Sequence, residues 1–338
     1  MKSKLTWAAA LFSFSVLVPY AGGANAAEEA PKVSIAIPAI PPIFVGVQVM
    51  VAKDQGFFKK FGLDVEVRNF PNGAEASRAV ASGDVDASLS PTPLIINQIS
   101  NTGIAYVGIY GTEKPAYYLA SLDPSATCKG MAGEAIGVDT PGGATSIALK
   151  NMLASCGLSI KDVQQVALSA NVPAAMIAGQ LKHGILHLDG VIAVEDQTGK
   201  KINPVVDYLA VRPVYHNMLV VVRRDKLAEN RDRYVRIVAG LIAAERFMHD
   251  PANYAAAAKI AAPTGRTEKQ AEEAVKRYVE IGFWPHDAAG LTKANIEAVE
   301  EEQVKVGNIR PGKTPVAYED LVDPSIYKDA MEMVDKAQ

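Results

Sequence analysis

The chain has 338 residues, 49% of them hydrophobic, and its 34 basic residues stand against 37 acidic ones for a net charge of −3. This mild, scattered acidity argues against nucleic acid or an anionic membrane surface as a partner. A chain of this length exceeds the usual single hydrophobic core, so two lobes are expected.

Residues 1–26 have the organisation of a secretory signal peptide. Lys2 and Lys4 give a positive start, an apolar run covers 5–18, and Ala24-Asn25-Ala26 is a small-x-small cleavage site. The alternative, a membrane anchor, is disfavoured because spanning a bilayer takes about 20 apolar residues. The sequence also has no cysteine near this site for a lipid. We therefore predict a periplasmic protein without a stable membrane anchor, beginning near Ala27.

Strand and helix patterns alternate over the next hundred residues. Period-two and β-branched runs predict strands at 33–37, 63–67, 85–89 and 104–109. Helical spacing predicts helices at 47–61, 73–82 and 93–101, the first two stopped by Gly62 and Gly83. This alternation is typical of a largely parallel α/β sheet.

The same pattern then restarts in what we take as a second lobe. Strands are predicted at 135–138 and 184–187, a Gly-rich turn at 140–146 leads into a helix, and another helix covers 172–178. A strand at 218–222 returns to the first lobe, and the chain beyond Asp225 is mainly helical. The predicted lobes are 27–118 plus 218–338, and 119–217, each a mostly parallel sheet flanked by helices, with a helical C-terminal extension.

The two cysteines, Cys128 and Cys156, both fall in the predicted second lobe. In an oxidising compartment they can form a single disulfide. The alternative is two buried free thiols, and it stays open because sequence does not show whether the Cβ atoms meet. Two cysteines 28 positions apart do not by themselves make a zinc site.

Two segments resemble a known family. Residues 51–67, Val-Ala-Lys-Asp-Gln-Gly-Phe-Phe-Lys-Lys-Phe-Gly-Leu-Asp-Val-Glu-Val, resemble the nitrate/sulfonate/taurine group of ABC-transporter substrate-binding proteins, which includes binders of thiamine-precursor pyrimidines. Residues 79–87, Ala-Val-Ala-Ser-Gly-Asp-Val-Asp-Ala, are similar to its helix-Gly-Asp-Val-Asp-Ala element. In the second lobe the group's Gly-Gln-Val-Asp-Ala is replaced by Gly179-Gln-Leu-Lys-His183. Ligand contacts of sulfonate or nitrate binders therefore do not transfer to this wall.

The resemblance implies a two-lobed periplasmic-binding-protein fold of type II-like topology. It also implies a monomer without cofactor that captures a small organic molecule between the lobes and delivers it to an ABC permease with its ATPase. A sulfonate, an aromatic carboxylate and a pyrimidine-like heterocycle stay open as ligands. The alternatives are an enzyme of cofactor biosynthesis on the same fold, or a periplasmic ligand-sensing module. The sequence contains no Gly-x-Ser-x-Gly, His-Glu-x-x-His or P-loop motif, which disfavours the enzyme.

Ligands of open α/β sheets bind outside the carboxyl ends of the strands. Residues at the predicted strand ends and at the crossover between lobes are therefore the expected ligand contacts: Phe44, Ser90, Thr92, Tyr110, Tyr117, Gly143, Ala144, Thr145, Ser146, His187 and Asp189. Several of them precede helices, whose free N–H groups and positive dipole end can hold a carboxylate, sulfonate or carbonyl. The alternative role of such hydroxyl side chains is to cap the helix.

The remaining features refine the expected ligand. Phe44, Tyr110 and Tyr117 would provide flat walls for a ring, unless they belong to the core. The strand ends contain few cations, Lys114 being the clearest, which argues against an inorganic anion. His187 is expected to contact the ligand. A metal site built with His183 is disfavoured because four residues along a strand span about 13 Å, and no metal is predicted.

Overall fold

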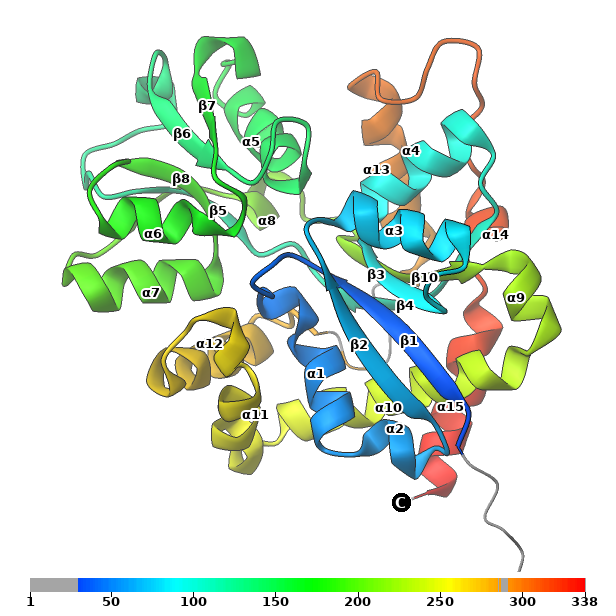
Figure 1. Cartoon of the computed structure of the whole chain (residues 1–338). Helices are drawn as coiled ribbons and strands as arrows, with labels where there is room; N and C mark the ends of the chain where they lie inside the picture. The colour runs from blue at the N-terminus through cyan, green and yellow to red at the C-terminus, as the bar shows by residue number, and fades with distance from the viewer. Residues whose placement is uncertain (1–29, 285, 287–290, 338) are drawn as a thin grey trace, which may run out of the picture.

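The computed structural model describes residues 30–284, 286 and 291–337, and the predicted signal peptide lies outside them. Two five-stranded sheets, each flanked by helices, stand side by side, and the helices of the C-terminal third gather mainly around the first sheet (Figure 1). The predicted two-sheet α/β architecture with a helical C-terminal region is confirmed.

The first sheet has the strand order β2-β1-β3-β10-β4. Its neighbours β2, β1 and β3 are parallel, whereas β10 is antiparallel to both β3 and β4. The sheet is therefore mixed, because β10 enters it from the opposite direction when the chain returns from the second sheet. The strands are β1 Lys32–Pro38, β2 Asp64–Phe70, β3 Ala87–Pro91, β4 Tyr106–Glu113 and β10 Met218–Arg223.

Both faces of the first sheet are buried, as expected for parallel strands. On β1, Val33 and Ile35 pack into one core cluster, and Ala36 packs into the cluster on the other face. The helices of this region are α1 Val47–Asp54, α2 Phe57–Lys60, α3 Gly73–Ser82 and α4 Thr92–Thr102. The helix predicted for 47–61 is interrupted because Gly56 takes a left-handed backbone conformation, with φ of 74°.

The second sheet repeats the design with the order β7-β6-β8-β5-β9. Here β7, β6 and β8 are parallel, and β5 is antiparallel to β8 and β9. The strands are β5 Tyr117–Ser121, β6 Ala135–Val138, β7 Gln164–Ala167, β8 His183–His187 and β9 Asn203–Asp207. The helices are α5 Ala144–Ala154, α6 Val172–Ile177, α7 Leu188–Thr198 and α8 Tyr208–Val211.

The chain passes between the sheets twice, from β4 to β5 and from α8 to β10. The proposed lobe boundary after residue 118 differs slightly from the first passage. Tyr117 and Tyr118 already pair with His187 and Leu186 of β8, so they belong to the second sheet. The proposed return at 218 coincides with the first residue of β10.

The C-terminal helices are α9 Arg224–Glu229, α10 Arg231–His249, α11 Tyr254–Ile260, α12 Glu268–Glu280, α13 Lys293–Lys305, α14 Tyr318–Leu321 and α15 Pro324–Lys336. Most of them pack on the first sheet, but α12 lies against α7 of the second (Figure 1). The C-terminal region therefore connects the two halves of the molecule. Across residues 30–284, 286 and 291–337, no helix has the length and apolar character needed to cross a membrane.

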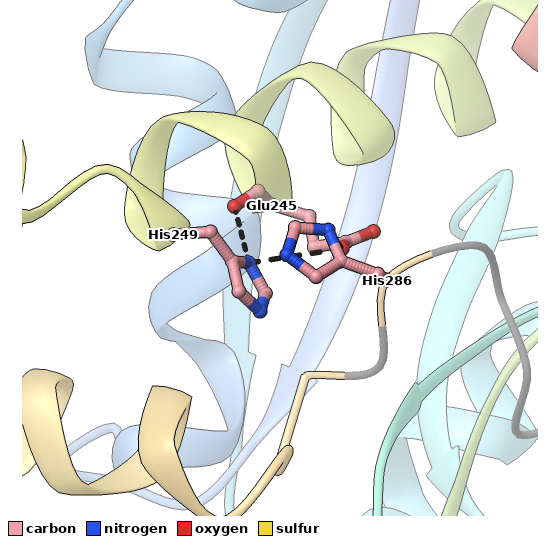
Figure 2. A group of neighbouring side chains, drawn as sticks. All are labelled: Glu245, His249 and His286. Carbon is pink, nitrogen blue, oxygen red and sulfur yellow. Dashed lines mark hydrogen bonds and ion pairs between the residues drawn. The ribbon is translucent and has the colours of Figure 1, made fainter.

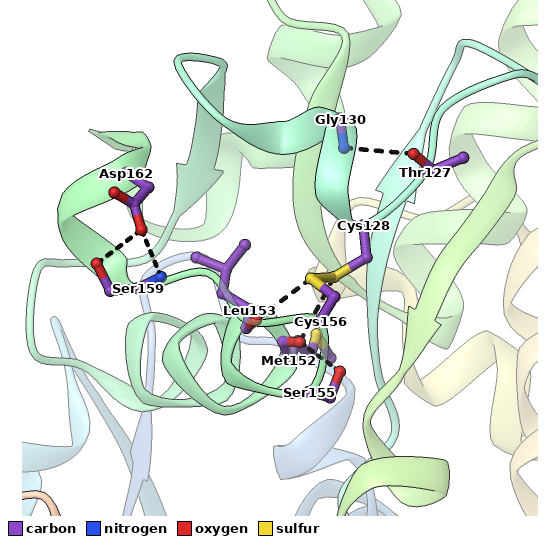
Figure 3. Close-up of a disulfide and its surroundings, with 9 residues drawn as sticks. All are labelled: Thr127, Cys128, Gly130, Met152, Leu153, Ser155, Cys156, Ser159 and Asp162. Atoms are coloured by element: carbon purple, nitrogen blue, oxygen red, sulfur yellow. Dashed lines mark hydrogen bonds between the residues drawn. A yellow bond between two sulfur atoms is a disulfide. The ribbon is translucent and has the colours of Figure 1, made fainter.

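Cys128 and Cys156 form a disulfide, with Cα atoms 6.1 Å apart (Figure 3). Cys128 precedes β6, and Cys156 follows the last turn of α5. The bond therefore ties the loop that enters β6 to the C-terminal end of α5. This confirms the pairing that the sequence left open.

Candidate ligand-binding site

A cleft of about 650 Å³ opens between the two sheets. Its walls include residues at or just beyond the ends of strands from both halves, among them Pro38, Pro91, Asp139 and His187. This is the position at which ligands bind open α/β sheets. The lining is mainly apolar, and its charged residues are Asp139, Asp189 and Arg266.

Five helices begin at this cleft, two from the first half of the molecule and three from the second. Residues of the first turns of α3, α4, α5, α6 and α7 line it, namely Gly73, Ala74, Pro93, Leu94, Ala144, Thr145, Val172, Pro173, Asp189 and Gly190. Helix N-termini carry unpaired N–H groups and a partial positive charge, so they stabilise negative charge or hydrogen-bond acceptors nearby.

At α5 the protein supplies that negative charge itself. The Asp139 carboxylate accepts a hydrogen bond of 2.6 Å from the Thr145 hydroxyl and another of 2.6 Å from the Thr140 N–H. A Cβ atom at Gly143 would lie 2.7 Å from the same carboxylate. Gly143 is thus required for the close approach of Asp139, and the anion at this helix N-terminus is an aspartate of the protein.

At α7 the same arrangement recurs with Asp189. Its Oδ1 accepts a 2.7 Å hydrogen bond from the Tyr278 hydroxyl, and its Oδ2 accepts from Nε of Arg266 at 3.0 Å. Arg266 also approaches Oδ2 through Nη2 at 2.8 Å. The charge of the cleft's arginine is therefore balanced inside the protein, and the C-terminal region holds the Asp189 carboxylate in place.

His187 and Tyr117 form an aromatic corner of the cleft. Their ring centroids are 4.5 Å apart with the planes 66° from parallel, an edge-to-face contact. The Tyr117 hydroxyl donates a 3.2 Å hydrogen bond to Oδ1 of Asn217. Burial lowers the pKa of His187, so its imidazole is neutral at pH 7 and can both donate and accept a hydrogen bond.

Six of the eleven predicted contacts lie in the cleft lining: Tyr117, Gly143, Ala144, Thr145, His187 and Asp189. Two of the predicted aromatic contacts lie elsewhere, in the core. Phe44 is buried and stacks on Tyr278 with ring centroids 5.5 Å apart, while its neighbours Ile43 and Val45 line the cleft. Tyr110 is buried on β4, where its hydroxyl contacts Gln48 and Glu245.

Three predicted hydroxyl contacts also lie outside the lining, and each hydroxyl has a hydrogen-bond partner within the protein. Ser90 shares a 2.9 Å hydrogen bond with Ser88. Thr92 bonds to Nδ1 of the buried His216 at 2.7 Å. Ser146 donates to Gln165 and accepts from the N–H of Gly142 at the turn before α5. The alternative role, capping the helix, does not apply to these hydroxyls either, because α4 and α5 have no side-chain cap hydrogen bond.

His216, the partner of Thr92, is expected to make the stability of the protein depend on pH. Burial lowers the pKa of His216 to about 3, far below the 6.5 of an exposed histidine. The unfolded chain therefore binds a proton that the native protein does not, and stability falls as the pH drops below about 6.5. Between pH 6.5 and 4.5 this loss amounts to about 2 kcal/mol.

We expect His216→Asn, which keeps a side-chain group near Thr92, to lack this part of the pH dependence. Urea unfolding of both proteins at several pH values measures this pH dependence. The difference between their free energies of unfolding isolates the contribution of His216, because the other histidines contribute equally to both proteins. If the free energy of unfolding of the two proteins changed by the same amount from pH 6.5 to 4.5, His216 would not be the cause of this loss of stability.

Several residues of the cleft lining are not among the contacts predicted from the strand ends. Arg266 precedes α12 in the helical extension, and Asn308 follows α13, so neither belongs to a predicted sheet. Ala39 and Ser169 line the cleft with φ of 78° and 51°, although neither is glycine. Positive φ at such residues costs about 1–3 kcal/mol and is concentrated at functional sites. Nothing in the sequence distinguishes these two residues.

Comparison with solved structures identifies the fold. The fold is that of periplasmic binding proteins. A periplasmic sulfonate-binding protein of an ABC transporter from Methylobacillus flagellatus matches with a TM-score of 0.69 and 16% identity, covering 91% of this chain and 96% of that one. The nitrate-binding protein of Synechocystis matches with a TM-score of 0.72 and 12% identity, covering 90% and 89%. The predicted fold class and its resemblance to nitrate and sulfonate binders are confirmed.

The family profile described as NMT1/THI5 like matches residues 45–253, more than half of the chain, and the protein belongs to this family. A curated Haemophilus influenzae protein named for thiamine biosynthesis is 24% identical over 190 residues. That match covers 54% of this chain and 59% of the relative, so the chain spans little more than half of that relative's length.

Proposed function

We propose that this protein is a periplasmic solute-binding protein that captures a small ring-bearing organic molecule in the cleft and delivers it to an ABC importer. The fold, the cleft between the two sheets and the relationship to periplasmic binding proteins support the binding role. Export rests on the predicted signal peptide, and the importer is proposed by analogy with the sulfonate-binding relative.

The charge balance of the cleft supports a particular ligand class. Two of the helix N-termini that the second half brings to the cleft already carry an aspartate, Asp139 at α5 and Asp189 at α7. The single arginine of the lining is paired with Asp189. An incoming sulfonate or carboxylate would therefore meet net negative charge without a free cation in the described lining.

A neutral heterocycle with N–H donors fits this cleft better. Its amino group would face the Asp139 carboxylate, and its ring would pack in the apolar lining beside Tyr117 and His187. Neutral His187 can serve either a donor or an acceptor on the ring. Of the three classes that the sequence left open, the pyrimidine-like heterocycle is the one we favour.

The test compares 4-aminopyrimidine, benzoate and ethanesulfonate as probes by calorimetry and thermal shift. We expect 4-aminopyrimidine to bind best of the three, and a ligand at 100 times its Kd to stabilise the protein by about 2.7 kcal/mol. Asp139→Asn keeps the oxygen that Thr145 contacts but removes the charge. It should weaken the aminopyrimidine at least about tenfold, equal to about 1.4 kcal/mol.

The matched control is Asp54→Asn, which removes an exposed aspartate at the end of α1, outside the cleft. Its affinity for the aminopyrimidine should equal that of the wild type. Tightest binding of ethanesulfonate, further improved by Asp139→Asn, would contradict the ligand class but leave the binding role. Chemical conversion of a probe by the purified protein would contradict the binding role itself.

A further inference from the structure

The ligand cleft extends beyond the strand ends as a groove between α4 and α5, which Figure 1 shows on opposite sides of the space between the two sheets. On α4, Pro93, Leu94 and Asn97 line the cleft, and their spacing of three and four residues puts them on one face of the helix. On α5, Ala144 and Ile147 line it at a spacing of three residues. One face of each helix therefore borders the cleft for about one turn.

The volume of the cleft exceeds what a single ring fills. The cleft measures about 650 Å³, whereas a cavity of roughly 150 Å³ is enough to hold benzene, so one ring takes up roughly a quarter of the space. The polar groups that we assign to the heterocycle, Asp139 and His187, lie at or just after the ends of β6 and β8. A ligand that fills the rest of the cleft therefore carries more than its ring.

The groove walls present apolar surface that the hydrophobic core does not use. Leu94 and Ile147 are half-buried, and neither belongs to the core clusters formed by the described residues. Their neighbours Ile95 and Leu149 are fully buried in the core. Removing apolar surface from water is favourable roughly in proportion to its area. The two half-buried side chains therefore favour an apolar occupant of the groove.

Polar contacts with α13 fix the spacing of the two walls and close the far end of the groove. Asn97 and Asn308 both donate side-chain N–H groups to Oε1 of Gln303, at 2.9 and 2.8 Å, and Gln303 is fully buried on α13. Further along α5, Asn151 donates to the buried carboxylate of Glu302, which also lies on α13. Because α4 and α5 are both bonded to one helix, the groove keeps its width, and the amides limit the length of what it holds.

The polar side chains at the C-terminal end of α10 are matched within the protein, in contrast to the groove walls (Figure 2). Nδ1 of His249 donates a 2.9 Å hydrogen bond to the backbone carbonyl of Glu245. Nδ1 of His286 lies 3.2 Å from the Glu245 carboxylate. These three residues do not line the cleft, and their contacts join α10 to the segment after α12. The groove is therefore the better place for a further ligand contact.

We infer that the groove between α4 and α5 binds a short apolar arm attached to the ring of the ligand. The inference rests on the proposed function, because the ring and its amino group stay at Asp139 and His187. The groove continues the same cleft, its half-buried walls are apolar, and side-chain amides close its end. The ligand class is therefore an amino-substituted heterocycle with an alkyl substituent of a few carbons, and Leu94 and Ile147 select for that substituent.

The test compares 4-aminopyrimidine with its 5-butyl and 6-butyl derivatives by calorimetry on the purified mature protein. The better of the two butyl derivatives should bind at least about tenfold more tightly than the parent ring, because its alkyl carbons leave water. Ile147→Trp fills the groove with a larger side chain and should lower this affinity ratio to near one. Leu94→Trp fills the groove from the facing wall and is a second test. Both side chains are half-buried, so neither replacement enters the core.

The matched control is Val304→Trp, which enlarges an apolar side chain that is 50% exposed on α13 and outside the cleft lining. This variant should keep the affinity ratio of the wild type. The inference is overturned if 4-aminopyrimidine binds and neither butyl derivative binds more tightly, or if the gain from the butyl group persists in both groove variants. Absence of binding by all three probes would instead overturn the proposed ligand class, and this inference with it.

Discussion

Replacing Arg266 with Met is expected to lower the free energy of unfolding by about 3–5 kcal/mol. The variant leaves Asp189 buried, with the Tyr278 hydroxyl and the N-terminus of α7 but no cation to stabilise its charge. Because proteins of this kind are stable by only about 5–15 kcal/mol, the loss should be plain in urea unfolding. Asp189→Asn tests the other half of the pair, and the double variant should recover part of the loss because no unpaired charge stays buried.

The matched control for this pair also joins α7 to the C-terminal region, at α12. Lys269 of α12 and Asp196 of α7 form an exposed ion pair of 3.4 Å. Lys269→Met should cost less than about 1 kcal/mol, because solvent screens exposed pairs. Equal losses from Lys269→Met and Arg266→Met would contradict the structural role assigned to Asp189. A normal stability of Asp189→Asn with weakened ligand binding would restore Asp189 as a ligand contact.

The second large effect is expected at the disulfide. Replacing both Cys128 and Cys156 with Ser should lower the free energy of unfolding by about 3–4 kcal/mol, because the bond closes a loop of 28 residues in the unfolded chain. The measurement is urea unfolding with and without a thiol reductant. Reduction should destabilise the wild type by a similar amount and leave the double variant unchanged. A wild type that unfolds at the same urea concentration with and without reductant would count against the prediction.

The regular elements could be predicted because their signals are local. The alternation of Val33, Ile35 and Ile37 with smaller or polar residues is that of a strand, and β1 forms there. Gly83 ends α3 in the left-handed conformation, as its position after the helix suggested. Gly56 was missed as a break within 47–61, because the apolar spacing continues across it while its φ of 74° interrupts the helix.

The candidate site could be predicted only in part, because a strand end does not show which way each side chain points. Ser88 and Ser90 are two residues apart on β3, so they share a face and bond to each other away from the cleft. Tyr110 likewise points toward α10 rather than the cleft. Tyr117 and His187 do reach the cleft, since they are paired directly across β5 and β8 at its edge.

The sequence by itself determined the alternation of strands and helices, the two-part organisation and the turns at glycine, since these follow from backbone sterics and side-chain periodicity over a few residues. The charges that govern the cleft were decided by the tertiary structure. Asp189 and Arg266 are 77 residues apart in the sequence, and they meet only because the C-terminal region packs against the second half of the molecule. Electrostatic interactions depend on the distance between groups in space rather than along the chain. The sequence alone therefore does not show which charged groups are paired.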